Sequence, residues 1–511
     1  MTDRLFHGDG RISARIATRV KRAPDPRAPR MTFDAAKAKR RLSNWRASNA
    51  SLRALMASEG AAVLGRCRDV VRNNPYAAGA SEIFVANTVG AGIKPSSLLE
   101  DAGLRDQVMR LWLQWTDECD ADGLVDLYGM QAAAARALFE AGEVFIRLRP
   151  RLAVDGLSVP LQLQMLESEM LDHGFNETLD SGNEIISGVE FDRIGRRVAY
   201  HFWRRHPGDG ASTFDGRDER TRVPAESVLH IFRVARPGQV RGVPMMAATV
   251  VKLWLLDQYD DAELERKKTA AMFAGFITSP TPDEVFEEDE DFTGDSASKV
   301  VSLEPGTMHQ LFPGESIEFA QPADVGGSYE AFQYRSLLAI FTGLGIPYTI
   351  GTGDLKRANY SSLRGALVEF RRRIQQLQHH TIVFQACRPI WNAWFDAAVL
   401  SGALRIAGYG DAPAQWRCAR WIAPKFEWVD PFKDLKAEAL AVQYGFKARS
   451  DVIEAEGYDP EETDRRIAAD TQRAKDLGIV ISNNPVPLDE EQADAVEEQL
   501  DDAADTGGSA A

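Results

Sequence analysis

A pair of helical patterns joined by a short polar segment constrains the fold of this chain more than any other feature. Apolar residues at helical spacing predict one helix from Tyr329 to Leu344 and a much longer one over 361–400, in which Pro389 predicts a kink. Between them, residues 346–360 are rich in Gly, Thr, Asp, Asn and Ser and predict a loop. Because loops between rigid elements often carry function, we expect this loop to be functional.

Composition indicates a chain that folds, with charge placed unevenly along it. The 511 residues are 44% hydrophobic, enough for sizeable cores, and the net charge of −15 argues against a general nucleic-acid coat. Charge blocks of one sign are usually solvated or disordered. We therefore interpret residues 1–32 as a flexible basic arm, which either contacts nucleic acid or a partner or is a solvated tail. Residues 481–511 read as a disordered acidic tail.

The four cysteines and the apolar runs indicate the cellular setting. Cys67, Cys119, Cys387 and Cys418 form no CxxC pair and lie in helix-like apolar surroundings, which predicts buried free thiols rather than disulfides or metal ligands. No apolar segment resembles a secretory signal or reaches the ~18 residues of a membrane helix. We expect a protein made and folded in a reducing cytosol, with no membrane contact.

Region 33–242 mixes helical and strand-like patterns and predicts one α+β domain with a modest antiparallel sheet, in a chain that is mainly α-helical overall. Helical patterns cover Ala77–Val89, Leu104–Asp117 and Leu127–Ala141. The strand-like runs, separated by Gly- and Asp-rich turns, are Val144–Leu148, Leu161–Leu166, Gly188–Phe191, Val198–Trp203 and Val228–Phe232.

A long helical pattern over 243–276 follows this region. Its ~30 residues without Gly or Pro would make a helix of about 45 Å, which suggests packing against copies of itself or spanning a gap. Residues 277–326 predict a small β-rich module, with strand-like pieces at Phe276–Thr278, Val300–Leu303 and Ile317–Phe319. Beyond the long helix predicted over 361–400, residues 401–431 are irregular and rich in Trp, and residues 432–480 predict short helices.

Motifs of known enzymes are missing from the sequence. It contains no P-loop, zinc-protease helix, hydrolase elbow, metal-type Cys/His spacing or calcium loop, so we predict no catalytic residue, cofactor or metal. Gly351-Thr-Gly353, followed by Lys356 and Arg357, is the nearest phosphate-binding lookalike, but it follows a helix rather than a buried strand. A nucleotide-binding enzyme that uses Gly351–Arg357 stays open as an alternative.

A series of short motifs resembles the lambda-like phage portal proteins, the head–tail connectors of long-tailed bacteriophages. The resemblance covers nearly the whole chain, and the order and spacing of the motifs carry it more than any one of them. The motifs are Arg72–Tyr76, Asn87–Ile93, Ala270–Phe276, Gly343–Tyr348, Gly353–Leu355, Asn359–Arg364 and Trp428–Pro431.

The resemblance implies a dodecameric ring at one capsid vertex, without catalysis, through which DNA is packaged and later ejected. Another structural or scaffolding ring of the virion stays open as an alternative. The segments would be a wing (33–242), two stem helices (243–276 and 327–345), a clip (277–326), a tunnel loop (346–360), a spine helix (361–400), a return to the wing (401–431) and a crown (432–480).

The resemblance also implies the partners and the location. Besides further copies of itself, the chain would contact double-stranded DNA without sequence specificity, the terminase large subunit, a head-completion or adaptor protein and the major capsid protein. It would be assembled in the bacterial host cytoplasm and end in the virion.

Two sets of residues are the candidate contact sites. The loop set would face DNA. Its few cations would guide the duplex without gripping it, since strong basic binding would hinder sliding. Contacts to phosphate suit any DNA sequence, because phosphate contacts carry no sequence information directly. Tyr348 and Tyr360 either bear on the duplex or anchor the loop. The loop set is Tyr348, Thr349, Thr352, Asp354, Lys356, Arg357, Asn359, Tyr360 and Arg364. The acidic set, an elaboration of the clip, would dock terminase or adaptor: Asp283, Glu284, Glu287, Glu288, Asp289, Glu290 and Asp291.

Overall fold

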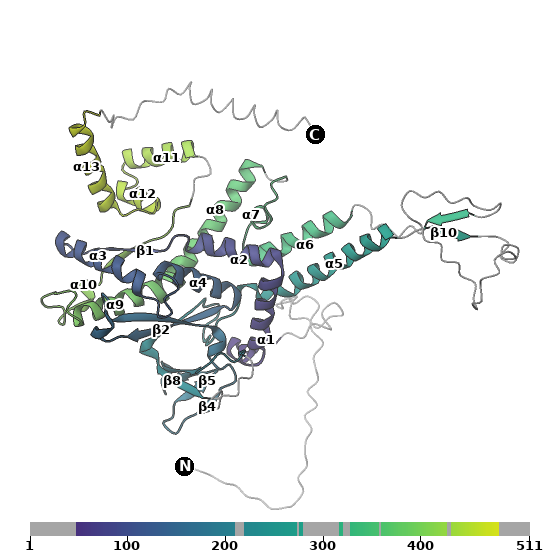
Figure 1. Ribbon diagram of the computed structural model, residues 1–511, viewed down its shortest axis with the longest axis horizontal. Coiled ribbons are helices and arrows are strands. Elements are labelled where there is room, and N and C mark those ends of the chain that lie inside the picture. The colour runs from purple at the N-terminus through teal and green to yellow at the C-terminus, as the bar shows by residue number, and fades with distance from the viewer. Residues whose placement is uncertain are drawn as a thin grey trace, which may run out of the picture. The chain divides into compact units, whose positions relative to one another are not determined.

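The fold is α+β and mainly helical, which confirms the predicted fold class (Figure 1). The computed structural model describes residues 48–209, 219–272, 275–278, 316–319, 328–356, 359–426 and 431–479. The described residues from Ser51 onward belong to one compact unit. The predicted strand at Val300–Leu303, both terminal tails and the acidic set at 283–291 lie outside the described residues.

The helices follow the predicted patterns closely, and polar caps fix several of their starts. Asn74 accepts hydrogen bonds from the backbone of Tyr76 and Ala77, so α2 begins at Pro75, two residues before the predicted start. The helices are α1 (Leu52–Asn73), α2 (Pro75–Thr88), α3 (Ala102–Glu118), α4 (Leu127–Glu140), α5 (Val250–Met272), α6 (Ser328–Leu344), α7 (Tyr348–Thr352), α8 (Tyr360–Leu377), α9 (Arg388–Leu400), α10 (Pro413–Trp416), α11 (Pro431–Gln443), α12 (Arg449–Ala455) and α13 (Pro460–Asp476).

The strands form several small antiparallel sheets rather than the one modest sheet predicted. A three-stranded sheet has the order β3-β2-β9, and a five-stranded sheet has the order β4-β5-β6-β7-β8. Consecutive strands β8 and β9 belong to different sheets because the chain turns through Ala225–Ser227 between them. The strands are β1 (Lys94–Ser97), β2 (Glu143–Pro150), β3 (Leu161–Leu166), β4 (Glu177–Thr178), β5 (Glu184–Ile186), β6 (Val189–Phe191), β7 (Arg197–Trp203), β8 (Arg220–Pro224), β9 (Val228–Phe232), β10 (Gly275–Thr278), β11 (Ser316–Phe319) and β12 (Ala419–Ile422).

A cluster of indole rings joins α9 to α3. Trp112 of α3 lies 4.9 Å from Trp391 and 5.0 Å from Trp394 of α9, between ring centroids, and all three side chains are buried. The Trp391 indole donates to the carbonyl of Arg417, just before β12, and β12 pairs with β1. Burial of large aromatic side chains dominates the energetics of such a core. The end of the long helix is therefore part of the core of the α+β region.

A buried ion pair joins the two larger sheets. Glu143 of β2 accepts hydrogen bonds from Arg241 Nε (2.7 Å), from the Gly242 backbone (2.6 Å) and from His230 Nε2 of β9 (2.9 Å). The remaining guanidinium protons go to backbone carbonyls between β3 and β6. These carbonyls belong to Ser168, Leu171 and Ser187. Every charge is compensated, which is the condition under which a buried pair is tolerated.

The same junction fixes where the chain leaves the sheets for α5. A side chain on Gly142 would lie 2.2 Å from the backbone of Val243, and one on Gly242 would lie 2.2 Å from the carbonyl of Gly142. The two backbones cross in contact, so both positions require glycine.

The first long helix is shorter than predicted. After Pro244 the chain makes a 3-10 turn over Met245–Ala248, and α5 runs from Val250 to Met272, 23 residues. The turn lets Met246 enter the core, and the Thr249 hydroxyl donates to its carbonyl. A local burial requirement therefore overrides the helical pattern of 243–249.

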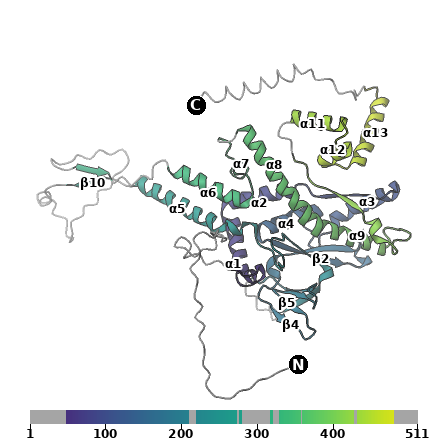
Figure 2. The same cartoon turned by 180° about the vertical axis from the view of Figure 1, so that it is seen from behind.

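Helices α5 and α6 pack antiparallel, side by side in both views (Figures 1 and 2). Tyr259 contacts Tyr329 and Phe332, and the Tyr329 hydroxyl donates to Asp260 at 2.9 Å. Nearer the core, a side chain on Gly343 would lie 2.4 Å from Thr249. These contacts set the register of the two helices along their length.

The predicted helix over 361–400 is present but is not one α-helix. Helix α8 passes into a π-helical stretch over Gln378–Cys387, and α9 follows with Pro389 in its first turn. Proline lacks the N–H of an α-helical bond and its ring crowds the preceding turn, so the wider π turn accommodates it. The distortion therefore precedes Pro389 rather than being a kink at it.

The C-terminal helices are held to the rest of the chain by charged contacts. Among the described side chains of 431–479, only Ala474 is buried. Ion pairs link these helices to α3, to β12 and to the segment after β12. The pairs are Arg105–Glu461, Asp106–Arg465, Arg420–Glu454 and Lys425–Glu456. Exposed ion pairs are individually weak and screened by salt, so this attachment depends on ionic strength.

The cysteines are free thiols, of which Cys67, Cys119 and Cys387 are buried. Cys418 is exposed, which corrects the prediction for that residue, because it precedes the edge strand β12 rather than facing a core. In the part of the chain that the structure describes, no helix is both long and apolar enough to cross a bilayer.

We expect the Glu143–Arg241 pair to be a major determinant of stability. Glu143→Gln should lower the free energy of unfolding by about 3–5 kcal/mol, because it leaves the buried Arg241 charge unpaired. Urea denaturation of the full chain measures this. Glu184→Gln, which breaks an ion pair with Arg53 between half-exposed side chains, should cost about 0–1 kcal/mol. Equal losses of unfolding free energy for the two substitutions would contradict the prediction that the buried pair is a major determinant of stability.

Stability should also fall as pH drops below about 6.5. Burial lowers the pKa of His230 to about 4, against an ordinary value of 6.5. The unfolded chain therefore binds a proton in this window that the folded chain does not, so stability is full above pH 6.5 and declines toward pH 4. His230→Gln keeps an N–H for Glu143 and should flatten the slope in urea titrations between pH 4.5 and 7. An unchanged slope would contradict the prediction.

Candidate functional site

The segment predicted as a loop contains a short helix that is packed onto α6. Helix α7 begins after Pro347 and ends at Gly353, whose φ of 71° is left-handed. A side chain on Gly351 would lie 2.2 Å from the ring of Phe341 in α6, so only glycine permits this contact. The prediction that 346–360 lacks structure is thus wrong for its first half.

Tyr348 anchors this segment to α6. Its ring lies 4.9 Å from that of Tyr334 in an edge-on arrangement, and its hydroxyl donates to Asp354 at 3.3 Å. Burial raises the pKa of Tyr348, and the neighbouring Asp354 carboxylate acts in the same direction. Of the two roles left open for Tyr348, the contacts fit the anchor.

Hydrogen bonds continue along the segment after α7. The Thr352 hydroxyl donates to the Tyr348 carbonyl and accepts from the Asp354 backbone. Asp354 accepts from the backbone of Lys356, whose side chain is exposed. Each candidate residue up to Asp354 thus contacts its own segment or α6; the half-buried Thr349 does so through its carbonyl, which accepts from the Gly353 backbone at 3.0 Å.

The far end of the segment is fixed by the start of α8. Asn359 accepts from the Ser362 backbone at 2.8 Å and caps the helix, so α8 begins at Tyr360, one residue before the predicted start at 361. Arg364 donates to Asp434 of α11 at 2.9 Å. Arg357 and the side chain of Tyr360 lie outside the described residues.

A cation of α8 lies against the end of α6. Gly345 follows α6 with a φ of 76°, and a side chain there would lie 2.5 Å from a guanidinium nitrogen of Arg373. Positive charge is favourable beside the carbonyls that end a helix. The point where α6 ends and the segment begins therefore lies against α8.

Sequence reasoning missed Tyr334, Phe341 and Arg373, which position the loop from outside it. The signal for Phe341 was present in Gly351, because glycine often marks a close approach of another group to the backbone. Tyr334 lies in an ordinary helical pattern, and Arg373 lies in the run Arg371–Arg373, which is typical of a charged helix face and does not point to the loop.

The backbone of the segment is not arranged as a phosphate cradle. The amide of Gly351 donates to Pro347 at 2.9 Å, and that of Gly353 donates to Thr349 at 3.0 Å. A phosphate-binding loop needs such amides to be free and to point toward the ligand. These two bonds argue against the nucleotide-binding alternative.

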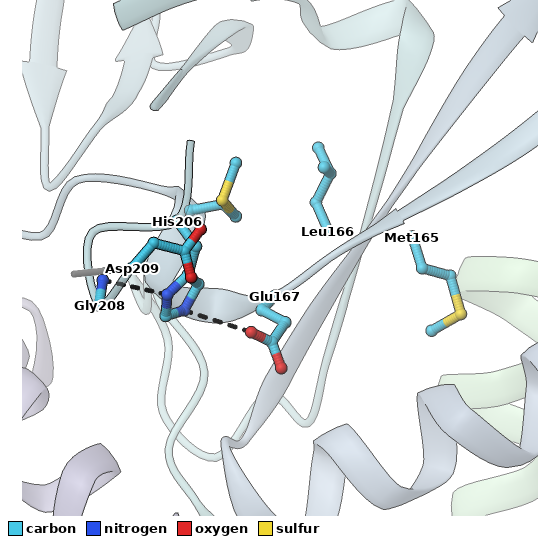
Figure 3. Close-up of a pocket in the computed structure, with 7 residues that line it drawn as sticks. Met165, Leu166, Glu167, His206, Gly208 and Asp209 are labelled. Atoms are coloured by element: carbon cyan, nitrogen blue, oxygen red, sulfur yellow. Dashed lines mark hydrogen bonds and ion pairs between the residues drawn. The ribbon is translucent and has the colours of Figure 1, made fainter. Parts of the chain in front are cut away.

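A different cluster, far from the loop in sequence, gathers groups that can ligate a metal. The ligand atoms of Glu167, Glu169 and His206 lie within 4.8 Å of one another. Glu167 and His206 also line a cavity of about 560 Å³ (Figure 3). Arg68 lies 3.2 Å from Glu167 and 3.1 Å from Glu169, so a cation already compensates both carboxylates. His206 Nδ1 accepts from the Gly208 backbone, and His206 Nε2 lies 3.2 Å from a carboxylate oxygen of Glu167 (Figure 3). The cluster is an ion-pair network rather than an open metal site.

Comparison with known proteins gives one family. Residues 38–378 match the model of the phage portal protein, lambda family. The probable portal protein of Halomonas phage phiHAP-1 is 27% identical over 429 residues, which are 81% of this chain and 80% of that protein.

Solved structures similar to this chain come from gene transfer agent particles. The neck of the native particle, computed with C12 symmetry, has a TM-score of 0.43 at 16% identity and covers 79% of this chain and 94% of its own. The neck of the empty particle, computed with C6 symmetry, has a TM-score of 0.44 at 15% identity with the same coverage.

The family assignment rests on the sequence matches, which confirm the resemblance carried by the motifs. Since the family model covers most of the chain, we conclude that this protein belongs to the lambda family of phage portal proteins.

Proposed function

We propose that the chain forms a closed dodecameric ring at one capsid vertex and that the segment 346–360 is its DNA-contacting tunnel loop. The support is the packing of the first half of this segment on α6 through Gly351 and Tyr348, together with the Asn359 cap that starts α8 at its other end. A loop held at both ends places the same groups at the same height in every subunit of a ring.

In this proposal the exposed end of the loop guides DNA without gripping it. The exposed Lys356 lies next to Asp354, so each subunit offers little net positive charge there. Affinity for DNA rises steeply with the number of phosphates neutralised. Few cations keep friction low, and contacts to phosphate rather than to base edges suit passage of any sequence. The DNA is then guided by many weak contacts, one loop from each subunit, rather than by a few strong ones.

The other segments take the roles that the family implies. Residues 33–242 with 401–431 would form the wing, α5 and α6 the stem, α8 to α9 the spine and 432–480 the crown. The clip at 277–326, with its acidic run, would dock the terminase large subunit and later a head-completion or adaptor protein, and the ring would contact the major capsid protein. Assembly would take place in the host cytoplasm, with the virion as the destination. The chain would act without catalysis and without a cofactor.

Electron microscopy of the purified full-length chain tests the ring. We expect class averages with a central hole and twelvefold symmetry, since a head-to-tail interface that closes gives a cyclic assembly. A monodisperse monomer would contradict the proposal. A ring of another number would correct the stoichiometry alone.

Replacing 353–358 with a Gly-Ser segment of equal length tests the loop. Rings should form as in the wild type, because Tyr348 and Gly351 keep α7 on α6. Nuclease-protected DNA per particle should fall severalfold, measured by quantitative PCR. Tyr348→Phe, which keeps the ring contact and loses only the bond to Asp354, serves as the mild control. Wild-type packaging with the Gly-Ser segment would contradict the proposed role.

A further inference from the structure

Helix α5 presents a row of large apolar side chains away from its packed face. Val251, Trp254 and Leu255 are 56%, 51% and 54% exposed. The opposite face of the helix buries Leu253 and Leu256 and meets α1 and α6. Neighbouring apolar side chains left in water on one helix face mark a contact surface rather than chance exposure. We call Val251, Trp254 and Leu255 the α5 ridge.

Helix α6 presents a different exposed face, on which three of four side chains are small. Ala331, Arg335, Ala339 and Thr342 recur at helical spacing and are all exposed. They point away from Gln333 and Ile340, which lie on the packed side. We call these four residues the α6 groove, since small side chains leave room for large ones from another helix.

The two faces lie at matching heights on the stem. Thr249 is level with Gly343, and Asp260 is level with Tyr329 and Gln333. Because the helices are antiparallel, Ala339 is then level with the residues of the α5 ridge. In a closed ring each subunit is related to the next by rotation without a shift along the axis. Residues at the same height on a stem that runs along the axis therefore meet.

Charge is complementary along the same faces. Asp261 is exposed and continues the ridge face of α5 toward the clip. Arg335 is the one cation of the α6 groove. The pairing of a large apolar ridge with a face of mostly small side chains at the same height suits a head-to-tail contact. Asp261 and Arg335, whose heights differ by more than one helical turn, add charges of opposite sign beside that contact.

We propose that the α5 ridge of one subunit packs into the α6 groove of the next copy of the same chain, and that this contact closes the stem of the ring. The inference rests on the proposed ring and names the surfaces that form it. The occupant of the ridge is a second copy because the complementary surface, at the matching height, lies on this chain.

Two leucines of α5 provide a matched test. Leu255 and Leu264 are 54% and 52% exposed, and nine residues at ~100° each place them about 180° apart around the helix. Leu255→Glu should abolish rings and give a monomer with an unchanged circular dichroism spectrum. Leu264→Glu should form rings. Light scattering after gel filtration measures both. Intact rings with Leu255→Glu, or equal loss with Leu264→Glu, would overturn the inference.

A mixing experiment separates this pairing from any other use of the same faces. Leu255→Glu damages the ridge and keeps the groove, whereas Ala339→Trp fills the groove and keeps the ridge. Each variant alone should be monomeric, and an equimolar mixture should give a heterodimer by sedimentation velocity, because one intact ridge meets one intact groove. A mixture that stays monomeric would overturn the pairing. If wild type also failed to form rings, the proposed function itself would fail.

Discussion

The buried pair of Glu143 and Arg241 is the interaction on which the rest of this fold depends. It joins the three-stranded sheet to the five-stranded one, and through Gly242 it fixes the point where the chain turns toward α5. An unpaired buried charge costs several kcal/mol, so the strand that carries Glu143 and the segment that carries Arg241 must become buried together. The point at which the chain leaves the α+β region for α5 is therefore set by an electrostatic constraint.

The helices around the loop and the C-terminal helices are held by different physical means. The end of the long helix is buried among indole rings, and α7 is packed on Phe341. By contrast, α12 and α13 meet the remainder mainly through ion pairs at exposed surfaces. The chain thus combines a rigid core, on which the segment 346–360 is packed, with C-terminal helices whose attachment responds to salt.

Much of the fold was predictable because its elements carry strong periodic patterns. Strands β3 and β9 have the predicted ends, and α6 begins one residue early. The errors fall where tertiary contacts compete with local preference. Met246 enters the core and shortens α5, the π-helical stretch replaces a kink at Pro389, and Phe341 holds α7 in a stretch whose composition indicates a loop. Local sequence cannot report the burial of Met246 or the contact of Phe341 with α7, since each depends on packing against other elements. The π-helical stretch has a local cause in Pro389, but proline alone does not tell whether a helix kinks or widens.

By itself the sequence determined the family and the order of the elements. Both follow from motifs and periodicities, which are local properties and can be recognised without knowing which residues are in contact. Only the tertiary structure decided how the candidate loop is held, that Arg364 binds Asp434 rather than standing free, and which faces of α5 and α6 stay uncovered. These features arise from side chains far apart in the chain that meet at one place. The periodicity of one helix shows that it has an apolar face, but only its neighbours determine whether that face is already buried.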